Sequence, residues 1–455
     1  MTLDAAESLQ EKIRSRSAVI AVVGLGYVGL PMAVELAKVG FKVHGIDLSD
    51  EKVAKVNRGE SYLRDIPSLT LAWLVQAGRL RASSDPDPLA EADAIFICVP
   101  TPFTANKAPD ISYIGRASES ISRLLRRGQL VVLQSTTHPG TTEEDVLPIL
   151  RRSGLAVGHD FFLAFSPERI NPGDRENTVA NTPKVVGGVT PACGAVARQL
   201  LRTITPQVHV VSSPRTAETC KLLENIFRSV NIALVNELAL LCERMKVDIW
   251  EVIAAASTKP FGYLPFYPGP GVGGHCIPVD PYYLSWKARE FDFYTKFIEL
   301  AAEVNQDMPY HVVRLVAAAL NRRGKALSDS DVLVLGVAFK RDVDDARNSP
   351  AERIIELLLE AGARVSYNDP FIPVFSVGDR ALHPQRIQLE SVPLSDHVLA
   401  RADCVAIVTG HSQYDYQAIL DRADMVLDCC NATRGSVARG NLLKLGATDG
   451  PVGGP

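Results

Sequence analysis

The chain has 455 residues, of which 46% are hydrophobic and 22% charged, and its formal net charge is −4. This length exceeds what one hydrophobic core holds, so we expect two or three domains. The mildly acidic balance gives no reason to expect nucleic acid as a partner, and no stretch has the apolar length of a membrane span. The polar N-terminus has no apolar run of the kind that marks export. Eight scattered cysteines without CxxC spacing fit reduced thiols in a cytoplasm and argue against a metal site.

A dinucleotide-binding fingerprint opens the first half of the chain. The apolar run at 18–23 is typical of a buried strand, and it leads into Gly24-Leu25-Gly26-Tyr27-Val28-Gly29 and a helix-like segment. A second strand, 41–46, ends at Asp47. The glycines allow a tight turn and the approach of a pyrophosphate, and the acid receives ribose hydroxyls. Because Asp47 would repel a 2′-phosphate, NAD is favoured over NADP, and FAD is the alternative that shares the fingerprint.

The alternation of strands and helices continues with predicted strands at 94–99, 130–133, 161–165 and 184–187. Thr101 and Thr136 follow the first two of these strands, at the edge of a doubly wound sheet that faces the ligand. Both are candidate cofactor contacts, with a turn or helix-cap role as the alternative. The polar loop SPERINPGD at 166–174 contains Glu168 and Arg169, and a solvated turn is its plain interpretation.

A long helix is predicted from 217 to about 245, where apolar residues recur at three- and four-residue steps. Lys221 and Asn225 share one face of this helix. Burying them among apolar neighbours is costly without partners, and a bound substrate is one such partner. For an isolated pair, the alternative that both face water is favoured. A second helix is predicted over 283–304, and helices between two α/β domains commonly form a dimer interface.

The segment 259–284, KPFGYLPFYPGPGVGGHCIPVDPYYL, is too rich in Pro and Gly for a continuous helix or strand. An irregular segment of this length is typical of a working loop. Gly271, Gly273 and Gly274 allow a positive φ and a close approach to a ligand. Cys276 follows them and is a candidate nucleophile, the alternative being a buried thiol that packs as a small hydrophobe.

A second α/β domain is predicted after a linker at 321–324, with strands at 332–335, 364–367, 405–408 and 425–427 and a helix at 351–360. The glycine fingerprint is missing, because Gly336-Val-Ala-Phe-Lys340 stands in its place, so this domain is expected to bind a different ligand. Lys340, Arg341, Arg347 and Arg434 supply cations near strand ends, which suits a phosphate. Each of them alone is typical of an ordinary surface charge.

The predicted fold class is α/β, with two Rossmann-like doubly wound domains joined by a long central helical segment. We place an N-terminal NAD-binding domain at 1–212, a central helical domain with the cysteine loop at 213–322, a C-terminal domain at 323–445 and a flexible tail at 446–455. An NAD site, a phosphate-binding domain and a thiol loop together suggest oxidation of an alcohol to a carboxylate. A thiolate traps the aldehyde, and oxidation then gives a thioester that water cleaves.

Four segments, VVGLGYVGLPMA, KLLENIFRSVNIALVNE, GVGGHCIPVDPYYL and GVAFKRDVDDARNSPA, together resemble the nucleotide-sugar 6-dehydrogenases of the UDP-glucose/GDP-mannose dehydrogenase family. The resemblance runs from about residue 18 to about residue 428, with the motifs in the family's order. FSPERINPGD and KPFGYLPFYPGPGVGGHC resemble the N-acetylhexosamine branch, in particular the bacterial UDP-N-acetylglucosamine 6-dehydrogenases.

The resemblance implies NAD-dependent four-electron oxidation of the C6 hydroxyl of UDP-N-acetylglucosamine, for surface polysaccharide biosynthesis, by a cytoplasmic homodimer or larger homo-oligomer. UDP-N-acetylmannosamine, UDP-N-acetylgalactosamine and UDP-glucose are alternative substrates, because no residue in the sequence distinguishes the epimers. A nucleotide-sugar sensor without catalysis is the alternative from another class of protein. The four groups Cys276, Lys221, Asn225 and Asp280 argue against it.

The resemblance also implies the catalytic roles. Cys276 is the thiol nucleophile, Lys221 and Asn225 stabilise the oxyanion and orient the reacting carbon, and Asp280 positions or activates water. Glu168 performs acid–base work. The UDP-glucose enzymes have a second glutamate four residues later, where this chain has Pro172.

The remaining assignments concern binding. The implied NAD contacts are Gly24, Gly26, Tyr27, Val28, Gly29, Asp47, Thr101, Thr136 and Arg347. The implied substrate contacts are Arg169, Phe261, Tyr267, Gly271, Gly273, Gly274, Lys340 and Arg434. The family's late arginine motif is altered here to CCNATRG, which leaves the register of Arg434 open. His275 is expected to be structural, since adjacent side chains in an extended loop point apart.

Overall fold

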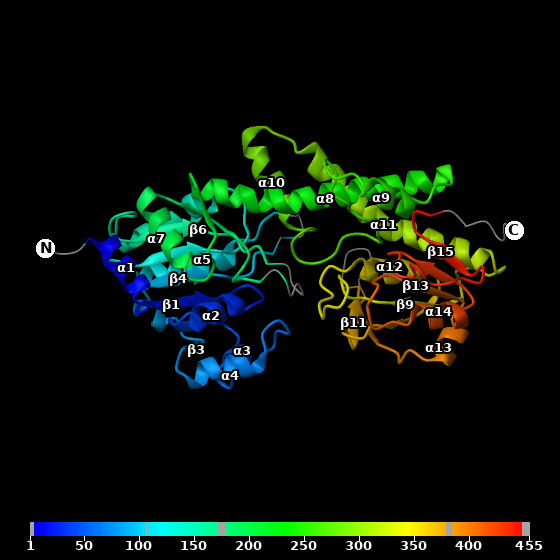
Figure 1. Cartoon of the computed structure of the whole chain (residues 1–455), viewed down its shortest axis with the longest axis horizontal. Helices are drawn as coiled ribbons and strands as arrows, with labels where there is room; N and C mark the ends of the chain where they lie inside the picture. Colours follow the sequence, from blue (N-terminus) through cyan, green and yellow to red (C-terminus); the bar gives the residue numbers. More distant parts are fainter. Residues whose placement is uncertain are drawn as a thin grey trace. The chain divides into compact units, whose positions relative to one another are not determined.

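The computed structural model describes residues 4–102, 104, 108–170, 176, 178–378 and 385–447. The chain forms two compact units, Met1–Glu224 with Tyr282–Phe293, and Asn225–Pro281 with Tyr294–Pro455. Both units include part of one long helix, α8 (Pro214–Met245), which is labelled in Figure 1. Each unit is built around its own sheet.

The sheet of the first unit has eight strands in the order β3-β2-β1-β4-β5-β6-β7-β8. β1 to β6 run parallel in the doubly wound order of dinucleotide-binding folds, whereas β7 is antiparallel to β6 and β8 is parallel to β7. The strands are β1 (Val19–Val23), β2 (Lys42–Ile46), β3 (Leu80–Ser83), β4 (Ala94–Ile97), β5 (Leu130–Leu133), β6 (Phe162–Phe165), β7 (Lys184–Gly188) and β8 (Val208–Val211).

Helices pack on both faces of this sheet, because successive side chains of a strand point to opposite faces. Ile20 and Val22 of β1 join a core formed with α1, α2 and α7, and Ala21 between them joins a second core formed with α5 and α6. The helices are α1 (Ala5–Arg14), α2 (Gly29–Lys38), α3 (Asp50–Asn57), α4 (Ser68–Gln76), α5 (Ser112–Leu124), α6 (Leu147–Leu150) and α7 (Pro191–Leu201).

The second unit has a five-stranded parallel sheet in the order β10-β9-β13-β14-β15, and a separate hairpin of β11 and β12. The strands are β9 (Asp331–Leu335), β10 (Arg364–Asn368), β11 (Val374–Val377), β12 (Ile387–Glu390), β13 (Cys404–Ile407), β14 (Val426–Asp428) and β15 (Leu442–Lys444). The helices are α9 (Ile249–Ala256), α12 (Pro350–Glu360), α13 (Asp396–Arg401) and α14 (Tyr416–Arg422). The predicted class, two Rossmann-like domains joined by a helical segment, is confirmed.

The single helix predicted over 283–304 is wrong. The chain forms α10 (Asp280–Ala288), a 3-10 turn and then α11 (Lys296–Asn321). Asp292 has a φ of 52°, a left-handed conformation that ends a helix. α11 continues through Pro309, a residue that normally disrupts a helix interior, so the sequence places its end too early.

The Pro- and Gly-rich segment has no helix or strand between α9 and α10, as predicted. Only its last residues are helical, because Pro281 occupies the first turn of α10, where a missing N–H costs nothing. Gly446, the first residue assigned to the tail, is hydrogen-bonded to the second unit. The Gly446 N–H donates to Glu243 over 2.8 Å, and its carbonyl accepts from Ile249 over 2.9 Å.

α8 is the one helix in the described ranges that is long and apolar enough to cross a membrane, a feature that the sequence analysis did not expect. In the apolar 18-residue window of this helix, 33% of the residues are buried inside the structure. Glu218, Asn225 and Asn236 on this helix are buried and hydrogen-bonded within their own units. Such satisfied polar groups are typical of a helix in a folded domain.

Candidate active site

The glycine loop between β1 and α2 provides space for a dinucleotide. Gly24 has a φ of 92°, and a Cβ there would lie 2.5 Å from the Cys98 carbonyl oxygen. A Cβ on Gly29 would lie 1.8 Å from the Gly24 carbonyl oxygen, whereas nothing lies within 4 Å of a Cβ on Gly26. Gly24 and Gly29 therefore close the loop, and Gly26 leaves it open where a pyrophosphate would approach the start of α2.

Asp47 holds this loop from the end of β2. Its carboxylate accepts the Leu25 N–H over 2.8 Å and the Ser49 N–H over 3.0 Å. The Tyr62 hydroxyl donates to the Leu25 carbonyl over 2.5 Å, and burial raises the pKa of Tyr62. Tyr27 is exposed, and Val28 is the residue that precedes α2. The predicted ribose acid is thus preorganised.

Thr101 and Thr136 follow β4 and β5, which are adjacent strands of the sheet. Thr101 is buried, and its carbonyl accepts a hydrogen bond from the Tyr283 hydroxyl on α10. Both threonines therefore lie at the edge of the sheet that carries the glycine loop, where a cofactor contact is geometrically suitable.

Glu168 lies in a buried polar cluster at the same edge. Its carboxylate accepts from Lys184 Nζ at 3.0 Å, Gln134 Nε2 at 2.7 Å and the backbone N–H groups of Arg169 and Ile170 at 2.8 and 3.1 Å. Sequence reasoning missed Lys184 and Gln134. The sequence gives little indication of their role, because each residue simply lies at an end of a predicted strand. These four donors fix the orientation of the Glu168 carboxylate.

Cys98 completes the cluster of Glu168, Lys184 and Gln134. Its thiol donates to Gln134 Oε1 over 3.4 Å, and burial followed by the charge of Glu168 raises the pKa of Cys98. A thiol in this environment is held protonated and serves as a structural hydrogen-bond donor.

Lys221 and Asn225 are buried on α8, with 8% and 0% of their surface exposed, so the interpretation that both face water is wrong. In the part of the chain that the structure describes, the Lys221 ammonium has no hydrogen-bond or ion-pair partner. Arg169, predicted to contact substrate, pairs with Glu224 over 2.6 Å and donates to the Pro183 carbonyl over 2.8 Å.

Cys276 lies in the second unit, four residues before Asp280 at the start of α10, and is half-buried. Its carbonyl accepts the N–H groups of Val279 and Asp280 at 3.1 and 2.8 Å, which places it at the N-terminus of the helix. All eight cysteines are free thiols.

The glycines before Cys276 serve protein packing in this structure. Gly271 and Gly274 have φ values of 129° and 89°, but Gly273 does not have a positive φ. A Cβ on Gly273 would lie 2.9 Å from Phe339 Cβ. The Gly274 N–H donates to the Arg347 carbonyl over 3.0 Å. Gly273 and Gly274 therefore approach the segment that follows β9.

Asn225 and Asp280 meet within the second unit. The Asn225 amide nitrogen donates to Asp280 Oδ2 over 2.5 Å, and its amide oxygen accepts from Arg228. Asp280 is also buried. Sequence reasoning missed Arg228, although its position three residues after Asn225 places it on the same face of the helix.

Three other predicted residues of the second unit, Lys340, Arg347 and Arg434, follow β9 and β14 in the chain. Arg347 forms a paired contact with Asp345 at 2.6–3.0 Å. Burial, together with the charge of Arg347, lowers the pKa of His275, which fits its expected structural role. Lys340 lies in the segment after β9, and Arg434 is exposed in the turn after β14.

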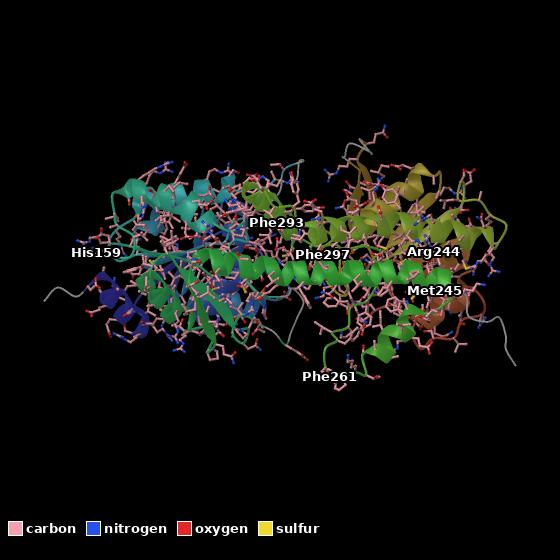
Figure 2. All side chains as sticks on the ribbon, turned by 90° about the horizontal axis from the view of Figure 1, so that it is seen from above. His159, Arg244, Met245, Phe261, Phe293 and Phe297 are labelled. Carbon is pink, nitrogen blue, oxygen red and sulfur yellow. The ribbon has the colours of Figure 1, made fainter. Side chains whose placement is uncertain are left out.

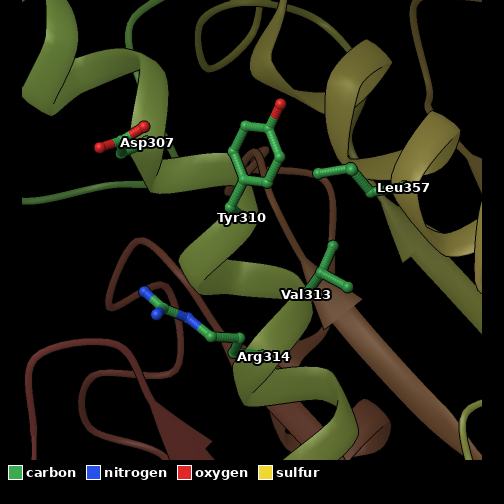
Figure 3. Close-up of a pocket in the computed structure, with 5 residues that line it drawn as sticks. All are labelled: Asp307, Tyr310, Val313, Arg314 and Leu357. Atoms are coloured by element: carbon green, nitrogen blue, oxygen red, sulfur yellow. The ribbon is translucent and has the colours of Figure 1, made fainter. Parts of the chain in front are cut away.

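Phe261 and Tyr267, two aromatic residues of the cysteine loop, are exposed. Phe261 is labelled in Figure 2, and Tyr267 stacks on Trp250 with ring centroids 6.2 Å apart. Pro172 lies outside the described residues. A separate cavity of about 500 Å³ is lined by residues that the sequence did not indicate (Figure 3): Asp307, Tyr310, Val313, Arg314 and Leu357.

Three domains of one family match the chain in order. The NAD binding domain of the UDP-glucose/GDP-mannose dehydrogenase family matches residues 18–205, the central domain 215–307 and the UDP binding domain 333–435. The chain belongs to this family. Its cofactor is NAD, for which the open glycine loop and Asp47 provide the fit, and its C-terminal domain is a UDP binding domain. The resemblance read from the sequence is confirmed.

Individual relatives differ in the sugar that they are named for. The chain is 37% identical to a UDP-N-acetyl-D-glucosamine 6-dehydrogenase from Pseudomonas aeruginosa, over 87% of this chain and 91% of that protein. It is also 37% identical to an NDP-N-acetyl-D-galactosaminuronic acid dehydrogenase from Ralstonia nicotianae, with the same coverage. The solved structure of a UDP-D-ManNAc dehydrogenase from Pyrococcus horikoshii is 32% identical with a TM-score of 0.85, covering 95% of this chain and 100% of that one.

Proposed function

We propose that this protein oxidises the C6 hydroxyl of a UDP-N-acetylhexosamine to the carboxylate, with UDP-N-acetylglucosamine as the preferred substrate. The family membership and the buried group of Asn225 and Asp280 beside the thiol segment support this proposal. The preference for glucosamine rests on the Pseudomonas relative and on the SPER and cysteine-loop motifs. The mannosamine and galactosamine epimers and UDP-glucose are the alternative substrates.

Cys276 carries the second half of the reaction. Its sulfur adds to the carbonyl carbon of the aldehyde, forming a C–S bond and a thiohemiacetal. Loss of hydride from that carbon gives a thioester, and water then cleaves the C–S bond to release the carboxylate and the thiol. Bound NAD supplies the hydride acceptor for both oxidations, so two NAD are reduced per sugar.

The buried polar groups stabilise the charge that develops. Among the described residues the Lys221 ammonium has no partner, so it is available to a developing oxyanion, as is the second hydrogen of the Asn225 amide nitrogen. Arg228 donates to the Asn225 amide oxygen, and this hydrogen bond orients the amide nitrogen toward Asp280. Asp280 is the base for the water that cleaves the thioester. Glu168 takes the acid–base role through the cluster of Lys184 and Gln134.

The assembly that we propose is a cytoplasmic homodimer. Within the second unit, α8 exposes apolar side chains at helical spacing, and the last of these, Met245, is labelled in Figure 2: Phe227, Leu234, Leu238, Leu241 and Met245. A stripe of this kind favours burial against a second copy. Sedimentation of the wild type beside a Leu234→Glu, Leu241→Glu variant tests this proposal, and a monomeric wild type contradicts it.

The proposal is tested by incubating the purified protein with NAD and each UDP-sugar and identifying the product. A uronic acid supports the dehydrogenase. The alternative is a nucleotide-sugar sensor without catalysis, and it predicts that UDP-sugar binds and is recovered unchanged after hours with NAD.

A further inference from the structure

The UDP binding domain repeats the backbone geometry of the NAD-binding loop. After β9, Gly336 turns with a φ of 80°, and its N–H donates to the Asn368 carbonyl over 2.9 Å. In the first unit, the Gly24 N–H donates to the Ile46 carbonyl over 2.7 Å in the same way. Asp369 follows β10 as Asp47 follows β2. Asp369 is therefore the counterpart of the ribose-binding acid.

Asp369 is closed to a ligand, unlike Asp47. Its side chain is 0% exposed, against 12% for Asp47. One carboxylate oxygen accepts the N–H groups of Val337 and Ala338 at 2.7 and 2.9 Å. The other accepts two more backbone N–H groups, from residues 371 and 372, at 2.8 and 3.1 Å. A carboxylate with this number of donors does not receive a ribose hydroxyl.

His411 adds a further hydrogen bond to the Asp369 carboxylate. Its Nε2 lies 3.1 Å from Asp369 Oδ2, and its Nδ1 accepts the backbone N–H of Asp342 over 3.0 Å. Because Nδ1 accepts, Nε2 is the nitrogen that donates to Asp369. The ring is fully buried between Phe371 and Tyr414, with centroids 5.0 and 5.7 Å away.

The two residues hold both ends of one short segment, 337–342. Asp369 binds its first two N–H groups and His411 binds its last. Lys340 lies inside this segment, and its neighbour Phe339 is the side chain against which Gly273 and Gly274 pack. Through this segment, His411 is structurally linked to both Lys340 and the loop that carries Cys276.

We propose that His411 is a positioning residue for the nucleotide part of the substrate. By bridging Asp369 and Asp342 it fixes the segment 337–342 in the conformation that presents Lys340 to a diphosphate. The acid that would bind ribose in a dinucleotide fold is thereby converted into an anchor for this segment. The inference rests on the proposed function, because it takes UDP as the ligand that Lys340 meets.

The test is the affinity of the full-length protein for UDP and, separately, for NAD, measured by calorimetry. His411→Phe keeps a ring but loses both hydrogen bonds, and we expect the UDP dissociation constant to rise about tenfold, since buried groups lose their partners. His411→Gln retains a donor near the Nε2 position, so we expect it to restore part of the affinity. The NAD dissociation constant should not change. His397→Gln, an exposed histidine of the same domain, is the control.

Three results overturn the inference. Equal UDP affinity of His411→Phe and wild type removes the positioning role. Equal losses of UDP and NAD affinity in both His411 variants show a general structural effect instead. A wild type that binds NAD but not UDP rejects the proposed function and this inference with it. This failure is distinguished from the first two results because UDP binding is then absent in the wild type itself.

Discussion

Asn225 and Asp280 are joined by a hydrogen bond of 2.5 Å between an amide nitrogen and a carboxylate oxygen, although 55 positions separate them in the chain. The bond links α8 to the first residue of α10, directly beyond the segment that carries Cys276. Both side chains are buried, so loss of either one leaves the other without one of its hydrogen bonds. This contact therefore helps to position the helix and the thiol segment.

Replacing one member of this pair should disable catalysis. In Asn225→Asp a second carboxylate faces Asp280 and the amide donor is lost, so we expect kcat to fall by about 100-fold, as when one oxyanion donor is removed. NAD affinity should be retained. Steady-state kinetics beside NAD titration measures both, and a kcat within a factor of two of the wild type would contradict the role of Asn225.

Replacing Lys221 should raise the stability of the protein and lower its activity. Lys221→Met keeps the length of the side chain but removes a buried cation that lacks a partner in the described residues, so Tm should rise while kcat falls about 100-fold. The matched control is Lys184→Met. Lys184 is paired with Glu168 at 3.0 Å, so its loss leaves a buried carboxylate and Tm should fall. A lower Tm in Lys221→Met would show that this ammonium has a structural partner.

Glu168 is tested through the pH dependence of the rate. The acid–base role predicts that Glu168→Gln removes the acidic limb of the kcat/KM profile. If Glu168→Gln lowers Tm and leaves the shape of the pH profile intact, the residue only supports its loop.

Asp93 gives the first unit a pH-dependent stability. Burial would raise the pKa of Asp93, but hydrogen bonds from Lys12, the Val19 N–H and Arg126 outweigh it and hold the pKa below its ordinary value of 3.8. The stabilisation is therefore complete above pH 3.8 and disappears as the pH falls through the lowered value.

Asp93→Asn should accordingly be less stable than the wild type by about 1–3 kcal/mol near neutral pH. The gap in Tm between the two proteins should close as the solution is made more acidic than pH 3.8. Thermal unfolding at a series of pH values measures the gap. A difference that stays constant down to pH 2 would mean that the charge of Asp93 is not the cause.

Asp47 sets the choice of cofactor. Asp47→Ser removes the carboxylate that repels a 2′-phosphate, so the ratio of kcat/KM with NADP to that with NAD should rise. The same change removes the acceptor of the Leu25 N–H, and NAD affinity should fall. An unchanged cofactor ratio would remove Asp47 from this role.

Local patterns in the sequence were sufficient for the features that depend on neighbouring residues. A strand, a glycine turn and a terminal acid predicted the loop around Gly26, and the Pro and Gly content predicted the segment before Cys276. The features that could not be predicted depend on residues that are distant in the sequence. Lys184 lies 16 positions from Glu168 and His411 lies 42 from Asp369, and no local periodicity connects such pairs. The packing of Gly273 on Phe339 was equally hidden, because a glycine does not indicate what approaches it.

The most direct measurement is the number of NADH molecules formed per molecule of UDP-N-acetylglucosamine consumed by the purified protein. The account predicts two NADH per sugar and a uronic acid product, and it predicts that Cys276→Ser binds NAD normally but fails to complete the acid. One NADH per sugar, or uronic acid produced at the normal rate by Cys276→Ser, would contradict oxidation through the Cys276 thiol.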